Sequence, residues 1–103
     1  MTTRKERIMN EFSKYGIKMG GVLMFKPSDA IRLVFRCRDE GISILGIDAF
    51  LMLNHNTIQP SMEHSVDFTS QRAPPNIDTH EAALQFLQDR LDTDYYFEVV
   101  IGD

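Results

Sequence analysis

The longest apolar run of the chain, residues 42–53, constrains the fold more than any other feature. Ser43, Gly46 and Asp48 are its principal interruptions. A run of this length and composition is typical of a central β-strand that is covered on both faces or nearly so. It is shorter than the roughly 18 apolar residues that a membrane-spanning helix requires. The run therefore predicts the middle strand of a sheet and excludes a transmembrane segment here.

Capping residues and helical spacing predict two helices on either side of this strand. The first covers residues 3–15 and begins with the capping-box spacing of Thr3 and Glu6. The second covers residues 79–91 and follows an N-cap at Asp78, with leucines at helical intervals behind it. Both helices have one apolar side, so we expect each to pack on the sheet.

Strands and loops account for the rest of the chain. Apolar and polar residues alternate over 62–69, apolar residues recur over 95–101, and a short apolar piece lies at 22–25. Residues 70–78, which include two prolines, predict a loop. We therefore predict a single α+β domain over residues 1–103, with a mainly antiparallel sheet of about four to five strands and two helices packed on it.

Residues 30–38 admit two interpretations. A helix opened by Pro27, Ser28 and Asp29 would place Ala30, Val34 and Cys37 on one face. A strand would alternate its apolar residues with arginines, and it would join the strand at 42–53 through a short loop that ends at Gly41. We predict the strand, because the segment is rich in β-branched and aromatic residues. Its wet face would carry Arg32, Arg36 and Arg38, paired across the sheet with Glu63, Asp67 or Glu98.

Charge is divided unevenly along the chain. Residues 1–38 hold nine Lys and Arg against three Asp and Glu, whereas residues 39–103 hold two against twelve. Either the basic third folds back and neutralises the acidic remainder, or the acidic remainder is displayed to a partner. A displayed acidic surface repels nucleic acid and anionic membranes and attracts cationic proteins. The candidate partner-binding residues are Glu63, Asp67, Asp92, Asp94 and Glu98.

Motifs of enzymes and metal sites are mostly absent from the sequence. No glycine-rich phosphate loop occurs, and the zinc-helix pattern that begins at His80 has Leu84 in place of its second histidine. Cys37 has no Cys or His neighbour and is expected to be a small core residue. Asp48 and His64 are the polar groups of a possible pocket, although a structural role is favoured for each. We predict no metal, no cofactor and no enzymatic activity.

The expected compartment is the cytoplasm. The sequence has one cysteine and no glycosylation sequon, and its charged beginning has no apolar stretch behind it. We expect neither nucleic acid nor a membrane as a partner, and the residues give no indication of the oligomeric state.

Three segments resemble those of small bacterial immunity proteins of polymorphic toxin and contact-dependent inhibition systems. They are Gly46-Ile-Asp-Ala-Phe50, Pro60-Ser-Met-Glu-His-Ser-Val-Asp-Phe68 and Tyr96-Phe-Glu-Val-Val100. The resemblance implies a stoichiometric inhibitor that binds and neutralises a cognate toxin domain, often a cationic nuclease. The alternative is a small ligand-binding domain or enzyme that uses the pocket around Asp48 and His64.

Overall fold

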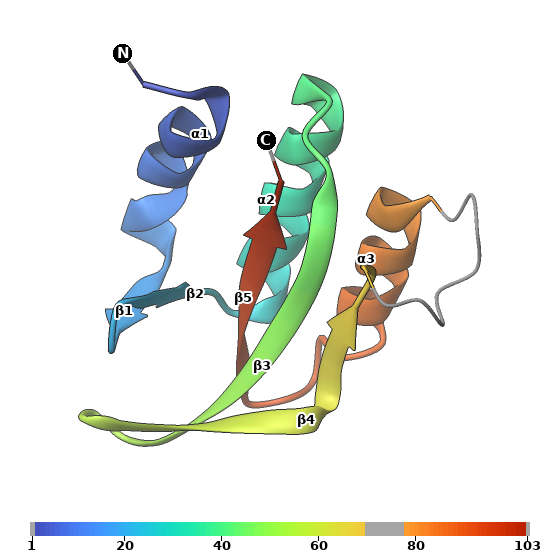
Figure 1. Cartoon of the computed structure of the whole chain (residues 1–103). Helices are drawn as coiled ribbons and strands as arrows, with labels where there is room; N and C mark the ends of the chain where they lie inside the picture. Colours follow the sequence, from blue (N-terminus) through green and yellow to red (C-terminus); the bar gives the residue numbers. More distant parts are fainter. Residues whose placement is uncertain (1, 70–77, 103) are drawn as a thin grey trace.

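The computed structural model describes residues 2–69 and 78–102, and within them the fold is α+β. Three α-helices, one short 3-10 turn and five strands form this part of the chain (Figure 1). The order is α1 (Arg4–Phe12), η1 (Ser13–Tyr15), β1 (Ile17–Met19), β2 (Val22–Met24), α2 (Pro27–Glu40), β3 (Ile44–Asn54), β4 (Thr57–Asp67), α3 (Thr79–Gln88) and β5 (Tyr95–Ile101). The α+β class and the antiparallel pairing are confirmed, whereas the expected number of helices was too small.

The larger sheet has three antiparallel strands in the order β4–β3–β5. β3 is therefore the middle strand, as the apolar run predicted. The smaller sheet is the hairpin β1–β2, whose turn uses Gly20 and Gly21 at φ 58° and 79°. Only its second strand was predicted from the sequence. In Figure 1 this hairpin and α1 lie on the side of β5 that faces away from β3.

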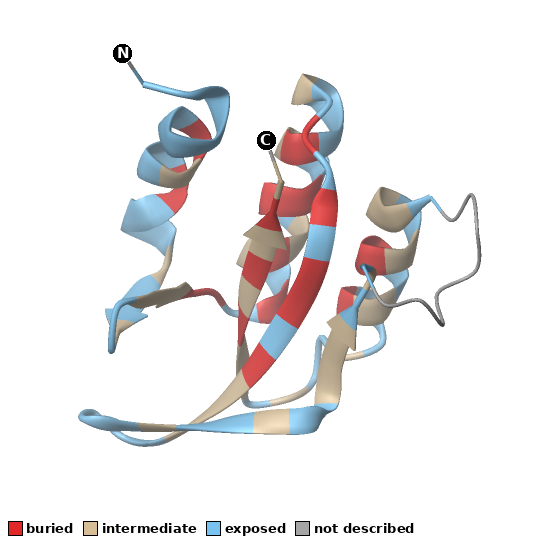
Figure 2. Cartoon of the chain, viewed as in Figure 1, coloured by how far each residue is buried: buried red, intermediate tan, exposed pale blue. Residues whose placement is uncertain are grey.

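Helices α2 and α3 pack on one face of the larger sheet, and the core lies between these helices and the sheet. Ile47 and Ala49 of β3 meet Leu33 of α2 and Leu87 of α3 in one buried cluster. Figure 2 shows buried and exposed residues succeeding one another along β3. The expectation that this strand is covered on both faces is wrong, because Asp48 is exposed and Leu45 retains 37% of its exposure.

Residues 27–40 form helix α2, so the strand predicted at 30–38 and its hairpin are wrong. The buried residues Ala30, Leu33, Val34 and Cys37 recur at helical spacing and pack into the core, whereas Phe35 remains 39% exposed. Pro27 begins the helix, and Gly41 ends it in the left-handed region at φ 70°. The helical interpretation was therefore the correct one.

The proposed sheet face of arginines is wrong for the same reason. Arg32, Arg36 and Arg38 belong to α2 and do not face Glu63, Asp67 or Glu98 across a sheet. Arg36 instead contacts carboxylates of the two first helices, with oxygens of Glu11 and Glu40 at 3.2 and 3.6 Å. Arg32 contacts Asp29 at 3.6 Å, and Arg38 lies over the ring of Phe35 at 4.9 Å.

The other boundaries follow from the predicted caps. The side-chain oxygen of Thr3 accepts from the Glu6 N–H at 3.1 Å, and Asp78 accepts from the N–H groups of His80 and Glu81. The strand predicted at 95–101 is confirmed as β5, and residues 62–67 of the strand predicted at 62–69 form the second half of the longer β4. Of the loop predicted at 70–78, only Asp78 lies within the described residues.

Candidate functional site

The face of the larger sheet that points away from α2 and α3, here called the outer face, carries two facing carboxylates. Asp48 of β3 is the direct cross-strand partner of Glu98 of β5. Ile47 and Ala49, the chain neighbours of Asp48, are buried, so Asp48 points away from the core. Direct cross-strand partners have their Cβ atoms about 4.5–5.5 Å apart, and like charges at that distance repel each other.

This arrangement shifts the ionisation of Glu98. Partial burial raises the pKa of the Glu98 carboxyl, and the charge of Asp48 raises it further. Among the described residues, neither carboxylate takes part in an ion pair. The pair therefore destabilises the free protein, and a cation placed across it would relieve the repulsion.

A groove of about 530 Å³ lies beside this pair on the outer face. Its rim includes Asp48 and Asp67, and its apolar lining includes Leu45, Met62 and Val100. The Asp67 carboxylate accepts from the backbone N–H and the hydroxyl of Thr69 at 2.8 and 2.6 Å. These hydrogen bonds lower the pKa of Asp67, so its charge persists at neutral pH. The groove thus combines carboxylates with an apolar floor.

A bulge in β4 builds one wall of this groove. Ile47 pairs with Val66 but Ala49 pairs with Ser61, so four residues of β4 lie between two neighbouring pairs. The Ser65 hydroxyl accepts from the Ala49 N–H at 2.9 Å and donates to the Ser61 carbonyl at 2.6 Å. A side chain therefore supplies the acceptor that a regular strand would supply from its backbone.

The bulge also explains why strand alternation misplaced Met62 and does not support a shared face for Glu63 and Asp67. Met62 was expected in the buried row with His64 and Val66, but the bulge pushes it out to 86% exposure. The shared parity of Glu63 and Asp67 no longer indicates a shared face, although both side chains are exposed. A bulge held by a serine hydroxyl leaves no pattern that an alternation argument detects.

The structure brings some of the predicted site residues together and separates others. Asp67 lies at the same groove as Asp48, and Glu98 faces Asp48 across the sheet. Asp92 and Asp94 lie in the turn between α3 and β5, and Asp94 lines a different groove. The register that pairs Asp48 with Glu98 was the feature that sequence reasoning missed.

His64 does not share a described groove with Asp48. Its ring is half-buried and stacks on Tyr95, with 4.6 Å between the ring centroids. Tyr95 has the inward parity of Phe97, so His64 lies on the core side of the sheet and Asp48 on the outer side. The structure thus provides no joint pocket for these two residues within its described part.

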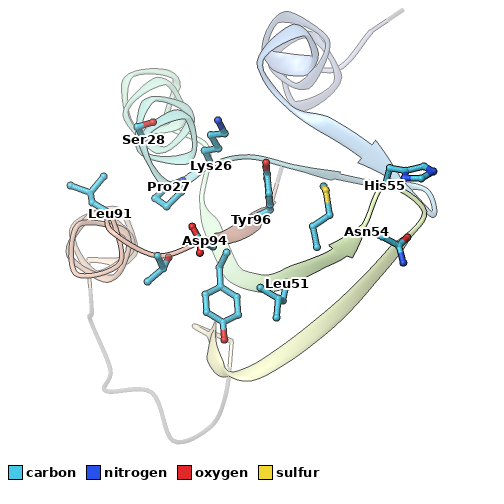
Figure 3. A pocket seen from close by; sticks show the side chains of 12 residues that line it. Lys26, Pro27, Ser28, Leu51, Asn54, His55, Leu91, Asp94 and Tyr96 are labelled. Carbon is cyan, nitrogen blue, oxygen red and sulfur yellow. The ribbon is translucent and has the colours of Figure 1, made fainter.

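A second groove, of about 770 Å³, lies where α2 begins (Figure 3). Lys26 and Ser28 line it from the start of α2, and Leu51 lines it from β3. Asp94 lines it from the turn before β5, and Tyr96 from β5 itself. Its charged groups have both signs, so it does not select one ligand charge.

The described residues contain no group of three or more His, Cys, Asp or Glu side chains placed to hold a metal ion. The His80 ring has a structural contact, because its Nε2 lies 2.7 Å from the Ile42 carbonyl oxygen. Cys37 is fully buried, and burial raises the pKa of its thiol to about 11 against a smaller lowering by Arg36.

No helix in the described part of the chain combines the length and the apolar character that crossing a membrane requires. Comparison with known protein families finds no family model that matches this sequence. Comparison with curated proteins gives no significant match either.

Proposed function

We propose that this protein is an immunity-type binding module, which neutralises a cationic toxin domain by binding it stoichiometrically at the outer face. The observation that carries the proposal is the Asp48–Glu98 pair, two facing carboxylates that form no ion pair with any described residue. A structural role does not explain the pair, because it destabilises the sheet. A basic side chain of a partner would turn this repulsion into attraction.

The distribution of ion pairs supports the proposal. Arg36 forms ion pairs with Glu11 and Glu40. Arg7 pairs with Glu40, and Arg32 pairs with Asp29. Apart from the contact between His80 and Asp78, no described ion pair reaches a carboxylate beyond residue 40. These arginines therefore pair with carboxylates of the first 40 residues and leave the outer-face carboxylates available to steer a cationic partner.

The composition of the groove also fits a protein partner. Leu45 and Met62 are exposed apolar side chains beside the carboxylates. Protein interfaces combine an apolar centre with a polar rim, and methionine adapts its shape to a partner. The alternative of a ligand pocket around Asp48 and His64 has less support, because the two side chains lie on opposite sides of the sheet.

The direct test is rescue of growth. Cells that express a toxin domain encoded beside this gene should survive when the wild-type protein is co-expressed. Asp48→Lys and Glu98→Lys should each slow association with the purified toxin domain about tenfold, because reversed charges repel a cationic partner. Each substitution places a lysine opposite a carboxylate, so the fold should be retained.

The matched control is Asp39→Lys, which reverses an exposed carboxylate on α2 that does not line the groove. It should leave association and growth rescue unchanged. Equal association rates for all three variants, or failure of the wild-type protein to rescue growth, would overturn the proposal.

A further inference from the structure

The groove at the start of α2 is lined by one exposed lysine and one exposed aspartate. Figure 3 shows Lys26, Asp94 and Tyr96 gathered at one end of this groove, close to where α2 begins. Neither Lys26 nor Asp94 takes part in an ion pair with a described residue. The two opposite charges therefore line one groove without neutralising each other.

The contact between β5 and the segment before α2 holds these residues in place. Phe25 and Phe97 exchange two backbone hydrogen bonds, at 2.8 and 2.7 Å. In an antiparallel pair, the next residue of one segment faces the preceding residue of the other, so Lys26 lies opposite Tyr96. Pro27 then begins α2, and the chain leaves β5 beside the groove.

The groove also has an apolar lining. Leu51 of β3 and Tyr95 of β5 are half-buried cross-strand partners, and Leu91 retains 49% of its exposure. The volume of about 770 Å³ lies in the range of small-molecule sites, which combine apolar walls with a few polar groups. The rings of Tyr95 and Tyr96 favour an aromatic group, because aromatic rings prefer each other as neighbours.

We propose that this groove binds a zwitterionic α-amino acid with an aromatic side chain. The carboxylate of this ligand contacts the Lys26 ammonium, and its ammonium group contacts the Asp94 carboxylate. Its ring packs on Leu51 and Tyr95. An anion or a cation alone would pair with one of the two charged groups and would be repelled by the other, so the two charges together select a zwitterion.

This site is separate from the proposed function, because the outer-face carboxylates do not line this groove. The probe is L-phenylalanine, titrated to millimolar concentration and followed by the NMR amide signals of Leu51, Tyr95 and Tyr96, which should shift along one saturation curve. Phenethylamine lacks the carboxylate and 3-phenylpropionate lacks the ammonium group. Each should bind about two- to fivefold more weakly, as expected for the loss of one solvated ion pair.

Two substitutions assign the two contacts. Lys26→Gln should weaken phenylalanine binding about two- to fivefold and should not weaken phenethylamine binding, because that probe has no carboxylate. Asp94→Asn should weaken phenylalanine binding by a similar factor and should not weaken 3-phenylpropionate binding. Lys18→Gln and Asp92→Asn are the matched controls, because they change exposed charged residues that do not line this groove.

Three outcomes would overturn the inference. The first is an analogue that binds as tightly as phenylalanine, because the groove would then select a ligand with a single charge. The second is unchanged phenylalanine binding by both groove variants, or an equal loss in the controls. The third is the absence of any shift of the groove signals at millimolar phenylalanine. Both groove substitutions are at exposed positions, and amide signals outside the groove show whether the fold is retained.

Discussion

Asp48 lies in the most apolar stretch of the chain, yet its carboxylate is on the surface. A buried carboxylate in that run would need a cation or several hydrogen bonds. The three-stranded sheet removes this requirement, because helices cover only one of its faces. The unfavourable interaction that remains is the repulsion between Asp48 and Glu98, which arises because the strand register places these two residues opposite each other.

Glu98→Gln should stabilise the protein at neutral pH. The raised pKa means that the folded state holds the Glu98 proton more tightly than the unfolded state does. Wild-type stability should therefore decrease as pH rises above about 4.3, the ordinary pKa of a glutamic acid. Because Glu98 is still partly solvated, the gain at pH 7 should be a few tenths of a kcal/mol. Urea unfolding of both proteins from pH 3 to 8 measures it, and a difference that does not change with pH would contradict this origin.

Cys37 should react slowly in the folded protein. Its thiol is fully buried, and a pKa of about 11 leaves little thiolate at pH 8. Alkylation by iodoacetamide should be at least about a hundredfold slower in buffer than in concentrated urea. Rapid labelling of the native protein would show that the segment around Cys37 opens locally.

Helix α2 shows how two periodicities can compete within one element. The segment alternates apolar and basic residues as a half-buried strand does, but its buried residues follow the helical repeat. Pro27 and Gly41 lie at its two ends, where each is best tolerated. The end signals were therefore more informative than the alternation.

Gly41→Val should destabilise the protein by about 1 kcal/mol or more, because a β-branched residue resists φ 70°. Gly41→Asn is the matched control and should cost less, since asparagine tolerates the left-handed region. Thermal unfolding compares the two. Equal stability of both variants would mean that the end of α2 rearranges without the left-handed turn.

Ser65→Ala tests the bulge in β4. It leaves the Ala49 N–H and the Ser61 carbonyl without their shared partner, at a cost of about 1–2 kcal/mol. Ser61→Ala is the control, because Ser61 contributes its backbone carbonyl and not its side chain to this contact. Denaturant unfolding of both variants should separate them, and equal losses would show that the hydroxyl does not hold the bulge.

The whole molecule separates its charges into different surfaces. From Arg4 to Met24 the chain holds five Lys and Arg against two Glu, and α2 holds three residues of each sign. The outer face carries Asp48, Asp67 and Glu98. The small net charge of −4 conceals this separation. A molecule of this kind presents surfaces of opposite sign to different partners.

Association with a cationic toxin domain should therefore be fast at low salt and should slow steeply above about 0.15 M, where the screening length is about 8 Å. Stopped-flow measurements over a salt series give this slope. The double variant Asp48→Asn, Glu98→Gln should flatten it without unfolding the protein. A slope that both proteins share would place the electrostatic contact elsewhere on the surface.

The sequence by itself determined the elements that local chemistry specifies. The caps at Thr3 and Asp78 placed two helices, and the apolar run placed the middle strand. These features depend on neighbours along the chain, so pattern and propensity were sufficient. The same reasoning identified Asp67 and Glu98 as candidate binding residues, a role that stays a prediction.

The tertiary structure decided what depends on residues far apart in the sequence. It selected the helix at residues 27–40, because only that form buries Ala30 and Val34 in the core together with Leu33 and Cys37. It set the register that faces Asp48 with Glu98, and it made the bulge through the contact of Ser65 with Ala49. Register and bulges follow from packing between strands, and packing is a property of the folded molecule that no local pattern contains.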